Sequence, residues 1–186
     1  MKKLIPVILT LSLLLLPVSG RASADGRGTE GIRLPVHALI LTMVENDLPY
    51  DADDDRFVWL ALYYALTMYG QVDLRARVTE DALLLPAECA EDFLHALFAR
   101  RAKLPPIPDG LPVSYDARGE EYRLALGDPG LDALTLGEPF PLGNGLYRVD
   151  GALTAPDSGR ELCVFTVTLA EDESMFGYSV HDAAAR

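Results

Sequence analysis

The chain has 186 residues, a formal net charge of −12, 49% hydrophobic residues and two cysteines. Its length suits one domain of ordinary size. An acidic chain without basic clusters repels phosphate backbones and anionic headgroups, so we expect neither nucleic-acid binding nor docking on an anionic membrane. The acidity otherwise indicates solubility and little more.

Residues 1–24 are typical of a secretory signal peptide. Lys2 and Lys3 provide a positive start, 4–18 is a largely apolar stretch, and small residues suited to cleavage end at Ala24. A transmembrane anchor fits less well, because the apolar stretch is short and cleavage residues follow it. We therefore expect export, cleavage near Ala24, a periplasmic or secreted mature protein, and no membrane span in the mature chain.

Residues 25–33 are polar and rich in glycine, which predicts a disordered lead-in before a single domain over 34–183. Pro35 suits the first turn of a helix. Apolar residues then recur at helical spacing, namely Val36, Leu39, Ile40, Met43 and Val44. This period predicts a first helix that ends by Asn46, followed by a turn.

The run Phe57–Tyr69 is apolar or aromatic at every position except Thr67. As a helix it is about 20 Å long, too short for a bilayer core of about 30 Å. A helix that is apolar all the way round must lie inside something. We therefore expect a buried central helix, with Gly70 as a left-handed stop.

Four aspartates precede this run, and they allow two interpretations. Asp51, Asp53 and Asp55 have the alternate spacing of the first calcium ligands of an EF-hand. The rest of that motif is absent, because Arg56 stands where the turn needs glycine and Leu62 stands where the bidentate glutamate belongs. The simpler interpretation is an N-cap, with negative charge at the positive end of the helix dipole.

The helical half of the domain, 34–102, continues with a short buried strand over Ala82–Leu85 and a helix over Ala87–Arg101. Apolar residues give this helix an inward face, namely Ala90, Phe93, Leu94, Leu97 and Phe98. A connector with four prolines follows over 103–112, and these prolines exclude a helix and favour an extended, stiff chain.

The β half, 113–183, has alternating segments bounded by turn residues. We expect strands at 113–115, 121–126, 131–136, 146–154, 161–169 and 175–181, and a frayed tail at 182–186. Short turns join the last three, which predicts an antiparallel meander with one wet face. Gly151, on the inner side, predicts a bulge or a close approach of another backbone.

Helices followed by turn-connected strands indicate the α+β class: N-terminal helices and a buried central helix packed on a curved antiparallel β-meander. This element order resembles that of cone-shaped domains of the nuclear transport factor or cystatin kind, in which a curved sheet wraps helices. The resemblance concerns element order alone, so it implies a layout and no function.

Catalytic and metal-binding patterns are weak. No Gly-x-Ser-x-Gly elbow is present, and no serine has an identifiable base nearby in sequence. Glu91 and His95 share a helix face at the spacing of a metal half-site, yet no third ligand can be named. We predict no cofactor. A disulfide between Cys89 and Cys163 is left open, because sequence does not show whether they approach.

A binding module is therefore the function that the sequence favours. Tyrosine and tryptophan suit the lining of a cavity, and the candidates are Trp59, Tyr63, Tyr64, Tyr147 and Tyr178. The partner would be a small apolar ligand or an envelope protein, and a homodimer is compatible. The alternative is an envelope hydrolase or metal-dependent enzyme whose site is dispersed in the sequence.

Overall fold

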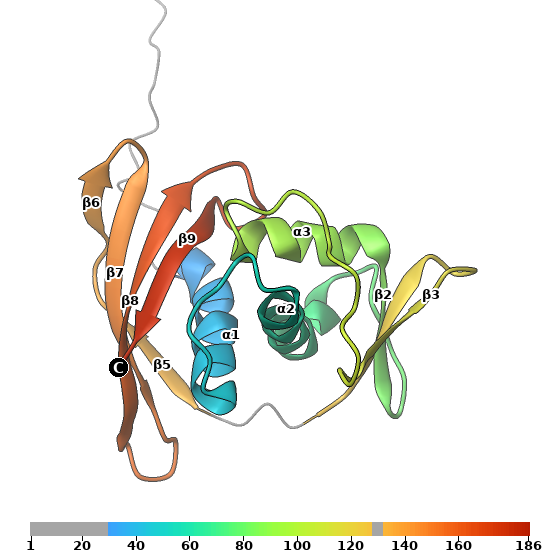
Figure 1. Cartoon of the computed structure of the whole chain (residues 1–186). Coiled ribbons are helices and arrows are strands. Elements are labelled where there is room, and N and C mark those ends of the chain that lie inside the picture. Colours follow the sequence, from blue (N-terminus) through green and yellow to red (C-terminus); the bar gives the residue numbers. More distant parts are fainter. Residues whose placement is uncertain (1–29, 128–131) are drawn as a thin grey trace, which may run out of the picture.

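Helices lie between two antiparallel sheets in a three-layer arrangement (Figure 1). The computed structural model describes residues 30–127 and 132–186. The predicted signal peptide and most of the predicted lead-in lie outside these ranges.

The middle layer contains three α-helices: α1 (Glu30–Asn46), α2 (Asp55–Tyr69) and α3 (Ala87–Leu97), with a short 3-10 turn, η1 (Gly70–Val72), after α2. Helix α1 contacts strands of the larger sheet, and α2 contacts both α1 and α3. Among the described residues, no helix is both long and apolar enough to cross a bilayer.

The larger sheet has the order β5-β7-β8-β9, with β6 paired to β7 as well. Its strands are β5 (Ala133–Leu136), β6 (Phe140–Gly143), β7 (Leu146–Thr154), β8 (Glu161–Glu171) and β9 (Tyr178–Ala185). The smaller sheet has the order β1-β2-β4-β3. Its strands are β1 (Arg77–Val78), β2 (Ala82–Pro86), β3 (Val113–Asp116) and β4 (Glu121–Ala125).

Helix α2 is the core of the middle layer, as its composition predicts. Asp54 caps its first turn by accepting a hydrogen bond from the backbone N–H of Arg56, at 2.8 Å. This supports the capping interpretation of the aspartates. The buried residues of α2 include Phe57, Trp59 and Leu62, and they belong to one apolar cluster with side chains of α1, of α3 and of both sheets.

The α+β class and the β7-β8-β9 meander are confirmed. The cone-like layout is not confirmed, because the strands form two sheets on opposite sides of the helices (Figure 1). The division arises from β2, which pairs with β4 in the register Ala82↔Ala125 to Pro86↔Glu121. A pairing across so long a stretch of sequence leaves no trace in local periodicity.

Several predicted details of the helices were wrong. Gly70 has φ −62° and continues into η1, so it is no left-handed stop. Residues 30–33 belong to α1 instead of a lead-in, and Val44 is exposed. Helix α3 ends at Leu97, because Phe98 is extended and the N–H of Ala99 donates to Val180 of β9 at 2.9 Å.

Two strand predictions also need correction. Strand β6 was not expected, since its sequence Phe-Pro-Leu-Gly has weak strand character. Strand β9 runs to Ala185, and Arg186 still bonds with Val164 through both backbone groups, at 2.8 and 3.1 Å. The predicted frayed tail is thus part of the larger sheet.

Gly151 confirms the expected close approach. A Cβ atom at this position would lie 2.4 Å from Cζ of Phe165 and 2.5 Å from the carbonyl oxygen of Thr135. Both distances are far below van der Waals contact, so the ring of Phe165 occupies the space that a side chain at 151 would need.

Candidate ligand-binding groove

An apolar groove of about 490 Å³ lies where the C-terminal end of α1 meets the ends of β8 and β9. Its walls come from three segments that are distant in sequence. They are residues 43–44 and 47–50, residues 162–163, and residues 183–186. The volume falls in the range of about 300 to 1,000 Å³ that is usual for small-molecule pockets.

The first wall is formed by the way α1 ends. Asp47 has φ 51°, a left-handed residue directly after the helix, and the N–H of Leu48 donates to the carbonyl of Met43 at 3.0 Å. This bond is that of a Schellman cap, which typically brings its two flanking apolar side chains together. Met43 and Leu48 accordingly both line the groove, and Pro49 directs the chain onward to Tyr50.

Tyr50 lines the groove and is hydrogen-bonded to the larger sheet. Its hydroxyl donates to the carbonyl oxygen of Val180 at 3.2 Å, and its ring packs against Phe57 and Phe98 at centroid distances of 5.6 and 6.0 Å. Burial raises the pKa of Tyr50 far above its usual range, so the hydroxyl stays neutral. Tyr50 therefore presents a neutral, hydrogen-bonded side chain to the groove.

The opposite wall owes its depth to small side chains. Ala183, Ala184 and Ala185 line the groove at the end of β9. Ala183 and Ala185 share one face of the strand, where larger side chains would take up space. Cys163 of β8 completes the floor and is buried. The sequence did not reveal this groove, because it predicted a frayed tail at residues 182–186. Their pairing with β8 gives the wall its shape.

Charged groups flank the apolar lining. Asp47 and Arg186 are the charged residues of the lining, and both are exposed. With the ten remaining lining residues apolar or aromatic, the groove can exclude water from an apolar ligand while leaving a polar end of the ligand in solvent.

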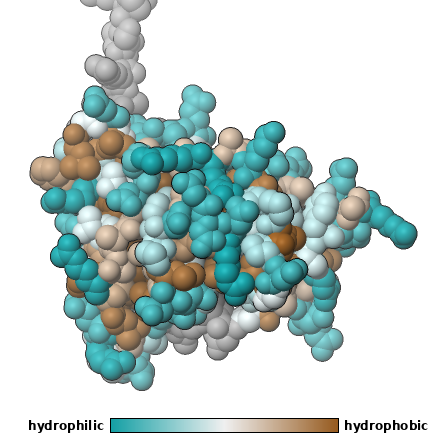
Figure 2. All heavy atoms as spheres, in the orientation of Figure 1, coloured by the Kyte–Doolittle hydropathy of each residue, from teal (hydrophilic) through white to brown (hydrophobic). Residues whose placement is uncertain are grey.

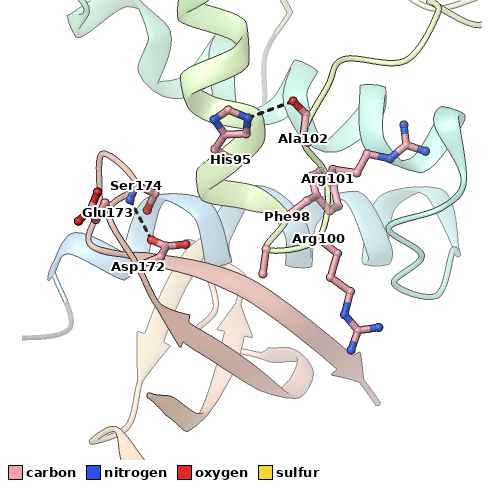
Figure 3. A pocket seen from close by; sticks show the side chains of 9 residues that line it. His95, Phe98, Arg100, Arg101, Ala102, Asp172, Glu173 and Ser174 are labelled. Carbon is pink, nitrogen blue, oxygen red and sulfur yellow. Dashed lines mark hydrogen bonds between the residues drawn. The ribbon is translucent and has the colours of Figure 1, made fainter. Parts of the chain in front are cut away.

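A second hollow, of about 440 Å³, separates the end of α3 from the turn between β8 and β9 (Figure 3). His95, Arg100 and Arg101 stand on the α3 side, and Asp172 and Glu173 stand on the turn. A cleft that carries both charge signs could hold a zwitterion if its charged groups were free to turn toward the ligand.

The arginines of this cleft have internal partners instead. The guanidinium of Arg101 donates to Asp55 at 2.7 Å and to the carbonyl oxygens of Ala52 and Asp53, at 2.8 and 3.1 Å. Arg100 donates to Nε2 of His181 at 2.9 Å, and Figure 3 shows both guanidiniums directed away from the turn. These cations hold the loop after α3 in place, so we favour the groove over the cleft.

The predicted residues of α2 lie in structural contacts. Trp59 is fully buried, and its indole nitrogen donates to the carbonyl oxygens of Pro105 and Pro106 at 3.0 and 3.2 Å. The Tyr63 hydroxyl donates to the carbonyl of Ala125 at 2.9 Å, and the Tyr64 hydroxyl donates to the carboxylate of Glu45. Burial, together with the Glu45 carboxylate, raises the pKa of Tyr64 to about 12.

Tyr147 and Tyr178 lie apart from α2, on the larger sheet. Their rings meet edge to face with a centroid distance of 5.7 Å. The structure thus brings Tyr63 next to Tyr64, at 5.9 Å, and Tyr147 next to Tyr178, and it does not bring the five residues into one cluster. None of the five lines the groove or the cleft, and their role in ligand binding stays a prediction.

The two cysteines are free thiols, and both are buried. Cys89 donates to the carboxylate of Asp73 at 3.3 Å, and burial raises its pKa to about 12. Arg75 binds the same carboxylate at 2.8 Å and holds the pKa of Asp73 below its usual range. A neutral thiol beside a carboxylate is a poor nucleophile, so this cluster fastens the η1 segment to α3.

Glu91 and His95 are exposed on one face of α3, as predicted, and the His95 ring lies 3.4 Å from the carbonyl of Ala102. Within residues 30–127 and 132–186, no three His, Cys, Asp or Glu residues converge on a possible metal site. Comparison with protein-family models, curated proteins and solved structures finds no match to this chain.

Proposed function

We propose that this chain is an exported binding module without catalytic activity that holds a small apolar ligand in the groove between α1, β8 and β9. The observation that supports this most is the composition of the groove, whose lining is apolar apart from Asp47 and Arg186. Burial of an apolar ligand surface contributes about 25 cal/mol per Å². Binding of this kind needs shape and an apolar lining, and no reactive group.

The test is binding of a neutral apolar fluorophore, N-phenyl-1-naphthylamine, to the full-length mature chain. We expect saturable fluorescence enhancement and a rise in thermal unfolding temperature with probe concentration, because a ligand that binds only the folded state stabilises it. Absence of saturable binding would contradict the proposed groove function.

A matched pair of alanine-to-leucine variants shows where on the protein the probe binds. Ala185→Leu places a larger side chain in the groove wall, whereas Ala133→Leu makes the same change at an exposed position of β5. We expect Ala185→Leu to weaken probe binding at least tenfold and Ala133→Leu to leave it unchanged. Circular dichroism checks that both variants keep their fold. Equal binding by wild type and Ala185→Leu would place the probe elsewhere.

Export is the second part of the proposal, and it rests on the pattern of residues 1–24 alone. Expression of the full precursor followed by fractionation and N-terminal sequencing tests it. We expect the mature protein outside the cytoplasm with Asp25 as its first residue. An uncleaved chain retained in the cytoplasm would overturn this part without affecting the groove.

A further inference from the structure

Strand β9 has an open edge where it lines the groove. Arg186 exchanges two backbone hydrogen bonds with Val164 of β8, at 2.8 and 3.1 Å. Bonded and non-bonded pairs alternate along an antiparallel ladder, so the N–H and C=O groups of Ala183 and Ala185 point away from β8. Among the described residues, nothing donates to or accepts from these backbone groups.

The same edge is closed nearer the start of β9. The carbonyl oxygen of Val180 accepts hydrogen bonds from the N–H of Ala99, at 2.9 Å, and from the hydroxyl of Tyr50, at 3.2 Å. The open stretch is therefore 182–186, which is about 17 Å long at about 3.4 Å per residue. It contains no proline, and the register shift between β8 and β9 falls between Val180 and Asp182, outside the stretch.

Apolar surface surrounds this stretch. Ala183 and Ala185 share the groove with Met43 and Leu48 at the end of α1. Figure 2 shows brown and tan atoms beside the strand end that Figure 1 marks C. An edge that combines unpaired backbone groups with apolar side chains is a surface that another strand can join.

The open stretch is complementary to itself in the antiparallel direction. Its sequence is Asp-Ala-Ala-Ala-Arg, with Ala184 at the centre. When two copies pair with Ala184 opposite Ala184, Ala183 of each copy lies opposite Ala185 of the other. Each of these two pairs then exchanges two backbone hydrogen bonds, because all of its N–H and C=O groups point toward the other copy.

The same register pairs the charged ends of the stretch. Asp182 of each copy lies directly opposite Arg186 of the other, on the outer face of the sheet, where both side chains are exposed. Side chains directly opposite on paired strands interact, since their Cβ atoms are about 5 Å apart. Within residues 30–127 and 132–186, neither Asp182 nor Arg186 forms an ion pair. Both are therefore available to a second copy.

Other registers lose one of these two features. A shift by one residue places alanines with open backbone groups opposite alanines whose groups are used by β8. A shift by two residues keeps the phase of the hydrogen bonds and separates Asp182 from Arg186. Hydrogen bonds and charges thus agree on one register.

We propose that two copies of this chain associate through β9 in this register and form one continuous antiparallel sheet about a twofold axis at Ala184. The partner strand extends the β wall of the groove, and the inference goes beyond the proposed ligand binding. The net charge of −12 opposes association at long range, but salt screens it beyond about 8 Å at physiological ionic strength. The twelve residues that line the groove are fewer than the roughly 20 to 30 per side of a standard interface, so we expect a weak dimer.

Charge reversal tests the register. Asp182→Arg places arginine opposite arginine in the dimer, and Arg186→Asp places aspartate opposite aspartate, so we expect each variant to be monomeric. An equimolar mixture of the two variants restores both ion pairs and should form the heterodimer. Sedimentation velocity of the mature chain at about 5 to 500 µM measures the mass, and wild type should shift toward dimer as the concentration rises.

The matched control is Glu173→Arg, at an exposed position on the turn before β9. It changes the net charge as Asp182→Arg does, and it should dimerise like wild type. Circular dichroism checks that all variants keep their fold. A wild type that stays monomeric, single variants that dimerise like wild type, or a mixture that stays monomeric would overturn the proposal. Probe binding enters none of these measurements, so such a result leaves the groove function standing.

A cysteine at the twofold axis tests the register independently. The two Ala184 residues form a non-hydrogen-bonded pair with Cα atoms about 4.5 Å apart, which is within the usual disulfide range of about 4.4 to 6.8 Å. We expect Ala184→Cys to give a disulfide-linked dimer under mild oxidation, whereas Ala133→Cys, exposed on β5, stays monomeric. The native thiols are buried and do not interfere. Equal cross-linking of the two variants would indicate random collision and overturn the proposal.

Discussion

The indole nitrogen of Trp59 lies 3.0 Å from the carbonyl oxygen of Pro105 and donates a hydrogen bond to it. Pro105 is buried, and the connector around it has too few N–H groups to form a ladder of its own. The bond therefore joins the N-terminal half of α2 to the segment that links the helices to β3. Trp59 supports the fold through this contact and through its packing on Tyr122, at 5.1 Å between ring centres.

Trp59→Phe should lower the free energy of unfolding by about 2 to 4 kcal/mol, because it leaves the carbonyl oxygen of buried Pro105 without its donor and opens a small cavity. Urea unfolding followed by circular dichroism measures the change. Tyr115→Phe, at a 45% exposed aromatic residue, is the control and should cost less than about 0.5 kcal/mol. Equal stability of the two variants would refute the anchoring role of Trp59.

Gly151→Ala should destabilise the larger sheet by about 1 to 3 kcal/mol, because the added methyl group overlaps the Phe165 ring and the Thr135 carbonyl. Adding Phe165→Leu should not restore stability, since the carbonyl remains in place. Gly119→Ala, which meets the flexible side chain of Glu121 at 3.2 Å, is a mild control. Calorimetry gives the three unfolding temperatures, and a wild-type value for Gly151→Ala would contradict the structure.

His37 should make stability depend on pH below 6.5. Burial lowers its pKa from 6.5, Arg33 acts in the same direction and Asp132 opposes both. Its Nδ1 lies 2.9 Å from the Tyr69 hydroxyl, and its Nε2 has no hydrogen-bond partner among the described residues. Below pH 6.5 the unfolded chain takes up a proton that the folded chain does not, so stability falls as the pH drops toward the folded pKa, by up to about 1.4 kcal/mol per pH unit.

His37→Gln removes this titration and still offers a hydrogen-bonding group to Tyr69. Urea unfolding at pH 7.5 and 5.5 should show a loss of stability in wild type that exceeds the loss in the variant by about 1 kcal/mol. Gln71→Ala, an exposed change without a titrating group, should follow wild type. Parallel pH profiles for wild type and His37→Gln would exclude His37 as the cause.

Both cysteines should resist alkylation in the native protein. Burial raises the pKa of Cys89 to about 12 and also raises the pKa of Cys163, so little thiolate is present at pH 7.5. Intact-mass analysis after maleimide treatment should show no label under native conditions and two labels in guanidinium chloride. Ala99→Cys, at an exposed position, provides the reactive control. A native mass that shows a disulfide would contradict the two free thiols.

The sequence predicted those elements whose residues carry their own local signal. Helix α2 is apolar at almost every position and is preceded by its Asp54 cap, and β7 and β8 alternate clearly, so each was found close to its true bounds. Strand β6 and the end of β9 carry proline, glycine and alanine, and they become strands because β7 and β8 offer free edges. In such segments the neighbouring strands, and not the intrinsic β-propensity of the residues, determine that a strand forms.

The candidate site was harder to predict than the fold. The groove depends on the small side chains of Ala183–Ala185 and on a helix cap that lies far away in sequence, and neither has a chemical signature. The aromatic residues chosen from the sequence have such a signature, but Trp59 and Tyr63 use their polar tips to bind backbone carbonyls. An amphipathic side chain suits a pocket and a structural anchor equally well.

The smaller sheet combines strands from both sides of the proline-rich connector, since β2 pairs with β4 across it. Cleavage of the chain in the connector would leave one fragment with β1 and β2 and the other with β3 and β4. Each fragment would then expose a strand whose backbone N–H and C=O groups pair only with the strand of the other fragment. The two fragments should therefore be poorly folded when separate and regain structure when mixed, and in the intact chain this sheet should form late, after the slow closure of a long loop.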